Sequence, residues 1–170
     1  MLILITGGSG SGKSAYAEQL VLEEGDAVRY YIATMPPYDE ECREKILKHQ
    51  ILRAEKHFQT IECYENLEGL TLDAGAVVLL ECLSNLTANI CFLEKKDWTD
   101  PVTAILSGIR HLQKQTKTLI IVTNEVFSDG SRCDLATEDY KSVLGTVNQQ
   151  ISELADRVIE VVYSIPLQLK

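Results

Sequence analysis

The chain has 170 residues, of which 45% are hydrophobic, so it is long enough for one well-filled core and too short for two typical domains. We therefore expect a single domain over residues 1–170. The 25 acidic residues outnumber the 16 basic ones and give a net charge of −9, which argues against non-specific binding to nucleic acid or to an anionic membrane. Any anionic ligand must therefore be held by local groups.

Five short apolar or β-branched runs alternate with segments of helix length, a pattern typical of a parallel sheet wrapped by helices. The expected strands are residues 2–6, 30–34, 76–81, 118–123 and 158–162. The expected helices are residues 14–24, 39–53, 83–95, 101–115 and 135–156. The strands are almost continuously apolar, as a sheet covered on both faces requires. The sequence thus predicts an α/β fold with helices on both faces of a mostly parallel sheet.

The last helix has the clearest apolar face, formed by Val143, Val147, Ile151 and Leu154. The tail that follows, residues 163–169, contains a turn and then alternates. This pattern predicts a small antiparallel strand at the edge of the sheet, near the C-terminus.

The loop after the first strand fits the pattern GxxxxGK[ST]. Small residues let successive backbone N–H groups surround nucleotide phosphates, while the lysine reaches the β and γ oxygens and the hydroxyl of the last residue can bind Mg²⁺. A plain strand-to-helix turn is the alternative, but the preceding strand, the full spacing and the following helix favour nucleotide binding. Kinases, ATPases, GTPases and transferases share this loop. Its residues are Gly7, Gly8, Ser9, Gly10, Ser11, Gly12, Lys13 and Ser14.

Polar residues follow the other expected strands, at the edge where open α/β sheets bind their ligands. Thr34 follows the second strand, and Glu81 ends the third. An acid at the end of an apolar strand can hold Mg²⁺ directly or through water, which makes Glu81 a candidate metal residue. Glu125, after the fourth strand, competes for this role. A merely solvated carboxylate is the alternative for either position.

His49 and Arg53 are four residues apart in the expected helix 39–53 and therefore share one face. A histidine offers a neutral, nucleophilic nitrogen near pH 7, and an arginine can offset the charge of a phosphoryl group. A histidine on a charged helix is more often a simple surface residue. The spacing alone leaves both interpretations open.

The five cysteines contain no CxxC pair, which favours a reducing compartment over a disulfide framework or a zinc site. The N-terminal apolar run is too short for a signal peptide or a membrane span. We therefore expect a cytoplasmic protein.

Short motifs follow one another in a specific order along nearly the whole chain. They are Leu4-Ile5-Thr6-Gly7-Gly8-Ser9, Gly12-Lys13-Ser14, Tyr31-Ile32-Ala33-Thr34, Lys45-Ile46-Leu47-Lys48-His49, Arg53, Thr60-Ile61-Glu62, Leu79-Leu80-Glu81-Cys82 and Val122-Thr123-Asn124-Glu125-Val126. Together they resemble the bifunctional adenosylcobinamide kinase/adenosylcobinamide-phosphate guanylyltransferases of cobalamin biosynthesis. The resemblance implies a P-loop NTPase (RecA-like) three-layer fold.

The resemblance also implies a reaction in which His49 attacks the α-phosphorus of GTP and becomes guanylylated. The phosphate of adenosylcobinamide phosphate would then take the GMP group from the histidine. In the kinase step, the γ-phosphate of ATP or GTP would move to the hydroxyl of adenosylcobinamide. The family forms trimers, so a homo-oligomer is expected.

Within this scheme Lys13 and Arg53 assist catalysis, Ser14 and Glu81 hold Mg²⁺, and Glu62 and Glu81 lie near the guanosine. The chain departs from the family at Ala54 and Phe58, where relatives usually have Pro and Trp, and in the segment after Glu125, where many relatives have a Gly-rich loop that contains Pro. Two alternatives stay open: another small-molecule P-loop kinase that forms no covalent adduct, and a nucleotide-dependent regulatory module.

Overall fold

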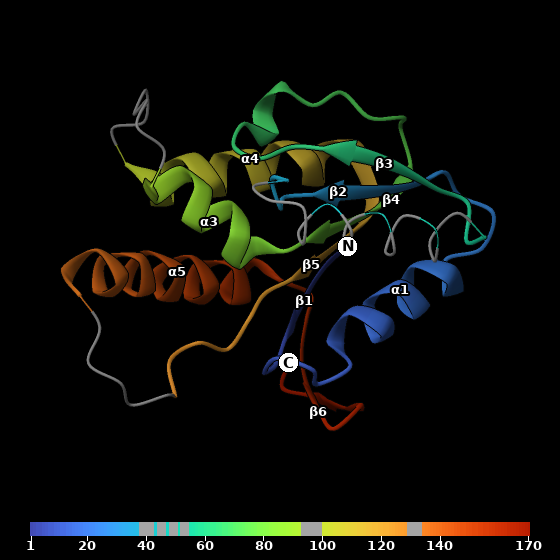
Figure 1. Ribbon diagram of the computed structural model, residues 1–170. Coiled ribbons are helices and arrows are strands. Elements are labelled where there is room, and N and C mark those ends of the chain that lie inside the picture. Colours follow the sequence, from blue (N-terminus) through green and yellow to red (C-terminus); the bar gives the residue numbers. More distant parts are fainter. Residues whose placement is uncertain (38–42, 44–46, 48–50, 52–54, 93–99, 129–133) are drawn as a thin grey trace.

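A computed structural model describes residues 1–37, 43, 47, 51, 55–92, 100–128 and 134–170 (Figure 1). The strands are β1 (Leu2–Thr6), β2 (Arg29–Ala33), β3 (Phe58–Glu62), β4 (Ala76–Glu81), β5 (Thr116–Val122), β6 (Arg157–Val162) and β7 (Ile165–Gln168). The helices are α1 (Lys13–Glu23), α3 (Leu83–Phe92), α4 (Pro101–Gln115) and α5 (Leu135–Leu154), with a short 3₁₀ helix η1 (Leu67–Gly69). Of the helix expected over 39–53, the described residues Arg43, Leu47 and Ile51 are helical.

All these strands form one sheet in the order β3-β2-β4-β5-β1-β6-β7. Neighbouring strands are parallel, except that β7 runs antiparallel to β6. The predicted parallel sheet with an antiparallel C-terminal edge strand is therefore confirmed.

The strand β3 is absent from the prediction. It lies at the edge of the sheet and pairs with β2 alone, so its residues are at most partly buried. An edge strand needs no continuous apolar run, and the sequence of β3 (FQTIE) accordingly lacks the signal that identifies the central strands.

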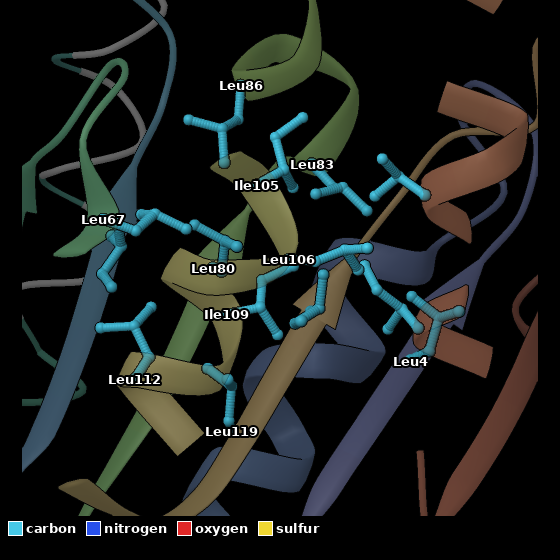
Figure 2. Close-up of a cluster of buried hydrophobic side chains, with 14 of the residues drawn as sticks. Leu4, Leu67, Leu80, Leu83, Leu86, Ile105, Leu106, Ile109, Leu112 and Leu119 are labelled. Carbon is cyan, nitrogen blue, oxygen red and sulfur yellow. The ribbon is translucent and has the colours of Figure 1, made fainter. Parts of the chain in front are cut away.

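Helices cover both faces of the sheet: α1 lies on one face, and α3, α4 and α5 lie on the other (Figure 1). The larger core fills the second side, where leucine and isoleucine side chains from β1, β4, β5, η1, α3 and α4 meet (Figure 2). Asp100 and Asp134 begin α4 and α5 by accepting hydrogen bonds from backbone N–H groups of the first turn. No helix in the described part of the chain is both long and apolar enough to cross a bilayer.

The buried face of α5 differs from the expected one. Leu144, Val147 and Ile151 are its buried residues, whereas Val143 is only partly buried and Leu154 is 41% exposed. At about 100° per residue, Val143 and Leu154 lie on one margin of the stripe that the three buried residues define. Leu154 is also the last helical residue, so no further turn encloses it.

Two glycines inside helices make a matched test of this packing. Alanine normally stabilises a helix interior by about 1 kcal/mol relative to glycine. A Cβ at Gly108 of α4, however, would lie 2.7 Å from the Cβ of Leu67, whereas one at Gly145 of α5 would meet the Phe127 ring at an ordinary 3.6 Å. We expect Gly108→Ala to destabilise the fold by about 1–3 kcal/mol through overpacking, and Gly145→Ala to be neutral or stabilising. Urea unfolding measures both; equal stabilisation would contradict the close packing of α4 on η1.

Candidate nucleotide site

The predicted phosphate loop lies between β1 and α1, and the side chain of its lysine reaches back to the loop backbone. The ammonium Nζ of Lys13 donates a hydrogen bond to the carbonyl oxygen of Gly8 at 3.0 Å, and the residue is only 8% exposed. Burial lowers the pKa of Lys13, while the nearby Cys82 and Glu81 act in the opposite direction. Phosphate oxygens in the loop would supply the negative charge that best stabilises this buried cation.

Glu81, at the end of β4, directly contacts the last residue of the loop. Ser14 Oγ donates a hydrogen bond to Glu81 Oε1, and the hydroxyl of Tyr31 donates one to Oε2 at 3.0 Å. A hydroxyl beside a carboxylate is an oxygen donor set of the kind that Mg²⁺ prefers, so these residues fit the metal that a nucleotide would bring. Glu125 makes no such contact with Ser14: its Oε1 accepts a hydrogen bond from the backbone N–H of Phe127 at 2.9 Å.

Tyr31 is not among the site residues that the sequence predicts. Tyr31 pairs with Leu79 and Ala33 pairs with Glu81, so the two-residue repeat of a strand puts Tyr31 on the same face of the sheet as Glu81. The alternation was a usable signal, but only the pairing of β2 with β4 identifies the acid that the tyrosine contacts.

Thr34 is fully buried, and its hydroxyl joins β2 to the residue after β4. Its Oγ1 donates to the carbonyl oxygen of Cys82 and accepts from the Cys82 backbone N–H, each at 2.8 Å. Burial raises the pKa of the Cys82 thiol. The role of Thr34 as a nucleotide ligand stays a prediction, since within the protein its hydroxyl already has two backbone partners.

Glu62 lies in the same row of the sheet as Glu81. Both residues align with Ala33 of β2, which lies between them. Two strand spacings of about 4.8 Å therefore separate their backbones by about 10 Å. The hydroxyl of Tyr64 donates to Glu62 Oε2 at 2.7 Å, and partial burial together with this carboxylate raises the pKa of Tyr64 to about 12. Glu62 and Glu81 thus lie at the ends of β3 and β4, on the same part of the ligand-binding edge.

The turn between β6 and β7 contacts the other side of the loop, a feature that the sequence did not predict. The backbone N–H of Ser164 donates to the carbonyl oxygen of Ser11 at 2.8 Å. A Cβ at Gly12, where φ is +91°, would lie 2.6 Å from Ser164 Oγ, and one at Gly7 would lie 2.5 Å from the carbonyl oxygen of Val161. These glycines therefore also serve the close approach of the C-terminal hairpin.

His49 and Arg53, the predicted nucleophile and its neighbouring cation, lie outside the described residues. The nearest described helical residues, Leu47 and Ile51, are both exposed. The roles of His49 and Arg53 therefore stay predictions.

The loop, the strand-end carboxylate that contacts it and the order of the parallel strands define a P-loop NTPase fold of the RecA-like type. Among solved structures, the flagellar accessory protein FlaH from Methanocaldococcus jannaschii is similar, with a TM-score of 0.53 over 94% of this chain and 70% of that one. At 15% identity this likeness supports the fold alone.

The sequence profile of the family described as "Cobinamide kinase / cobinamide phosphate guanyltransferase" matches residues 3–169. The chain is 34% identical to the "Bifunctional adenosylcobalamin biosynthesis protein CobU" of Salmonella typhimurium over 185 aligned residues, covering all of both chains. It is 31% identical to the corresponding protein CobP of Pseudomonas aeruginosa, with 98% of this chain and 96% of that protein covered. The chain belongs to the cobinamide kinase/cobinamide phosphate guanyltransferase family, which confirms the resemblance seen in its motifs.

The two hydrogen bonds of Thr34 make its structural role testable. Thr34→Val keeps the shape but leaves the N–H and carbonyl of Cys82 without this partner, so we expect a loss of about 1–3 kcal/mol in the free energy of unfolding. Thr34→Ser keeps the hydroxyl and should lose less. If Thr34→Val were as stable as the parent but bound nucleotide poorly, the hydroxyl would serve the ligand and not the fold.

Proposed function

We propose that this protein phosphorylates adenosylcobinamide and then transfers GMP from GTP to adenosylcobinamide phosphate, giving adenosylcobinamide-GDP. The observation that carries this proposal is the match of the family profile to residues 3–169. The contact between Ser14 and Glu81 supports it, because it brings the end of the phosphate loop together with a carboxylate at the ligand-binding edge. We further propose that the protein is cytoplasmic, as its cysteine pattern indicates, and that it is a homotrimer, as the resemblance implies. Sedimentation at the 19.0 kDa of one chain would contradict the trimer.

In the guanylyl transfer, a ring nitrogen of His49 attacks the α-phosphorus of GTP, and the bond to the bridging oxygen breaks to release pyrophosphate. A phosphate oxygen of adenosylcobinamide phosphate then attacks the same phosphorus, and the P–N bond breaks to restore the free histidine. In the kinase step, the substrate hydroxyl attacks the γ-phosphorus of ATP or GTP, loses its proton, and displaces the nucleoside diphosphate.

The predicted site residues have separate tasks in this scheme. Lys13 and the loop N–H groups hold the phosphate chain, and Arg53 offsets charge at the phosphorus that is attacked. Ser14 and Glu81 would hold Mg²⁺, which supplies positive charge to the phosphate oxygens when it is bound. Glu62 accepts hydrogen bonds from the guanosine, and Thr34 contributes to the same nucleotide site.

The covalent step predicts a labelled protein. GTP labelled at the α-phosphate should leave an acid-labile, base-stable label that His49→Asn removes entirely, because the asparagine has no nucleophilic nitrogen. His57→Asn is the matched control, since His57 is exposed at a φ of +58° that asparagine tolerates, and it should keep the label. Mass mapping after GTP exposure locates the adduct. A label that survives His49→Asn would contradict the assignment. Transfer of the γ-phosphate without any adduct would indicate a kinase that has no guanylyltransferase activity.

The proposed metal residues predict how Mg²⁺ affects nucleotide affinity. The parent protein should bind GTP more tightly with Mg²⁺ than without it, and Ser14→Ala and Glu81→Gln should each reduce this enhancement by about tenfold, since each removes one oxygen ligand or its charge. Calorimetric titration with and without Mg²⁺ measures the ratio. If Glu125→Gln removed the enhancement and Glu81→Gln did not, the metal role would pass to Glu125.

A further inference from the structure

A pocket of about 320 Å³ opens beside the phosphate loop, between the segment after β5 and the end of β6, the two strands that flank β1. Its volume falls at the lower end of the range of about 300–1,000 Å³ that is usual for small-molecule sites. Its walls come from the loop, from the segment after β5 and from the end of β6 with the following turn. The lining residues are Gly8, Ser9, Gly10, Ser11, Glu125, Glu160, Val161, Val162 and Tyr163.

The walls of this pocket suit a flat group that donates hydrogen bonds. Val162, which is 36% exposed, contributes apolar surface, whereas Val161 is fully buried. Tyr163 is a lining residue that is 91% exposed, so its ring is available for stacking. None of the described lining residues is basic, whereas Glu125 and Glu160 are carboxylates, which repel a further phosphate and accept hydrogen bonds from N–H and O–H groups. A nucleobase with its ribose has these properties.

The hairpin fixes the pocket relative to the loop. The turn residues Tyr163 and Ser164 have φ values of +50° and +63°, and the N–H of Ser164 bonds the carbonyl of Ser11 in the loop itself. The backbone of the turn at Tyr163 therefore lies next to the loop that would hold the phosphates. A nucleotide whose phosphates occupy the loop can extend its nucleoside into this pocket without any movement of the sheet.

The pocket is well separated from Glu62. β3 lies four strand positions from β1, about 19 Å along the sheet at about 4.8 Å per spacing, and β6 is the neighbour of β1 on the opposite side (Figure 1). A nucleoside near Glu62 and one in the pocket would therefore extend from the loop in opposite directions. A nucleotide with its base in the pocket would direct its γ-phosphate away from the hairpin, toward Ser14 and Glu81.

We propose that the pocket between the phosphate loop and the β6–β7 turn binds the base and ribose of the nucleoside triphosphate that donates its γ-phosphate, with Tyr163 stacking on the base. This inference rests on the kinase half of the proposed function. It assigns the base-binding surface of that step to residues that are distinct from Glu62 and Glu81.

The test compares two ligands that share the phosphates but not the nucleoside: a non-hydrolysable ATP analogue and inorganic tripolyphosphate. Stacking on an aromatic side chain is worth about 1–3 kcal/mol per base, so Tyr163→Ala should weaken binding of the analogue by about tenfold or more. Its affinity for tripolyphosphate should stay unchanged. Tyr163→Phe keeps the ring and should bind the analogue as the parent does. Ile165→Ala, an exposed position in the same hairpin that does not line the pocket, is the matched control and should leave both affinities unchanged.

Two results would overturn the proposal. One is an unchanged affinity of Tyr163→Ala for the ATP analogue. The other is an equal loss for both ligands, which would mean that the turn only supports the loop. Neither measurement needs cobinamide or His49. A protein that binds both ligands as expected but transfers no phosphate would therefore contradict the proposed function without contradicting the proposed base pocket.

Discussion

The burial of β1 at the centre of a parallel sheet is the constraint on which the rest of this structure depends. Leu2 and Ile5 are completely buried, because the strand has β5 on one side, β6 on the other and packed helices on both faces. Parallel strands all end at the same edge, so the loop that follows β1 must share that edge with the ends of the neighbouring strands. Glu81, which ends β4, meets the loop there.

The phosphate loop is consequently held from both sides. On one side Ser14 bonds Glu81 of β4, whose second oxygen is bonded by Tyr31 of β2. On the other side the β6–β7 turn bonds the loop backbone at Ser11. A loop with these two supports keeps a fixed shape, which lowers the cost of organising phosphate ligands at the time of binding. Its glycines meet two demands at once: approach of the phosphates and approach of the hairpin.

This arrangement suits an enzyme that uses nucleoside triphosphates in two reactions. The kinase step requires the γ-phosphorus to be accessible to the attacking group, whereas guanylyl transfer requires the α-phosphorus to be accessible. Glu62 and Glu81 are carboxylates bonded by tyrosine hydroxyls, whereas the pocket beside the β6–β7 turn combines Tyr163 and Val162 with the carboxylates of Glu125 and Glu160. One phosphate loop between the two proposed nucleoside surfaces would serve both steps.

The sequence by itself determined the central strands, most helices and the loop, because these features are local. Continuous apolar runs identify strands covered on both faces, and the spacing of Gly7 to Ser14 specifies a phosphate loop. The same local signals fail where burial is partial. The sequence therefore does not predict β3, and it predicts a buried face of α5 that includes Val143 and Leu154 in place of Leu144.

Only the tertiary structure decided that Glu81 and not Glu125 contacts Ser14, that Tyr31 supports this carboxylate, and that the C-terminal turn bonds the loop. These contacts join residues far apart in the chain, and the order of strands in the sheet, which no local pattern encodes, brings them together.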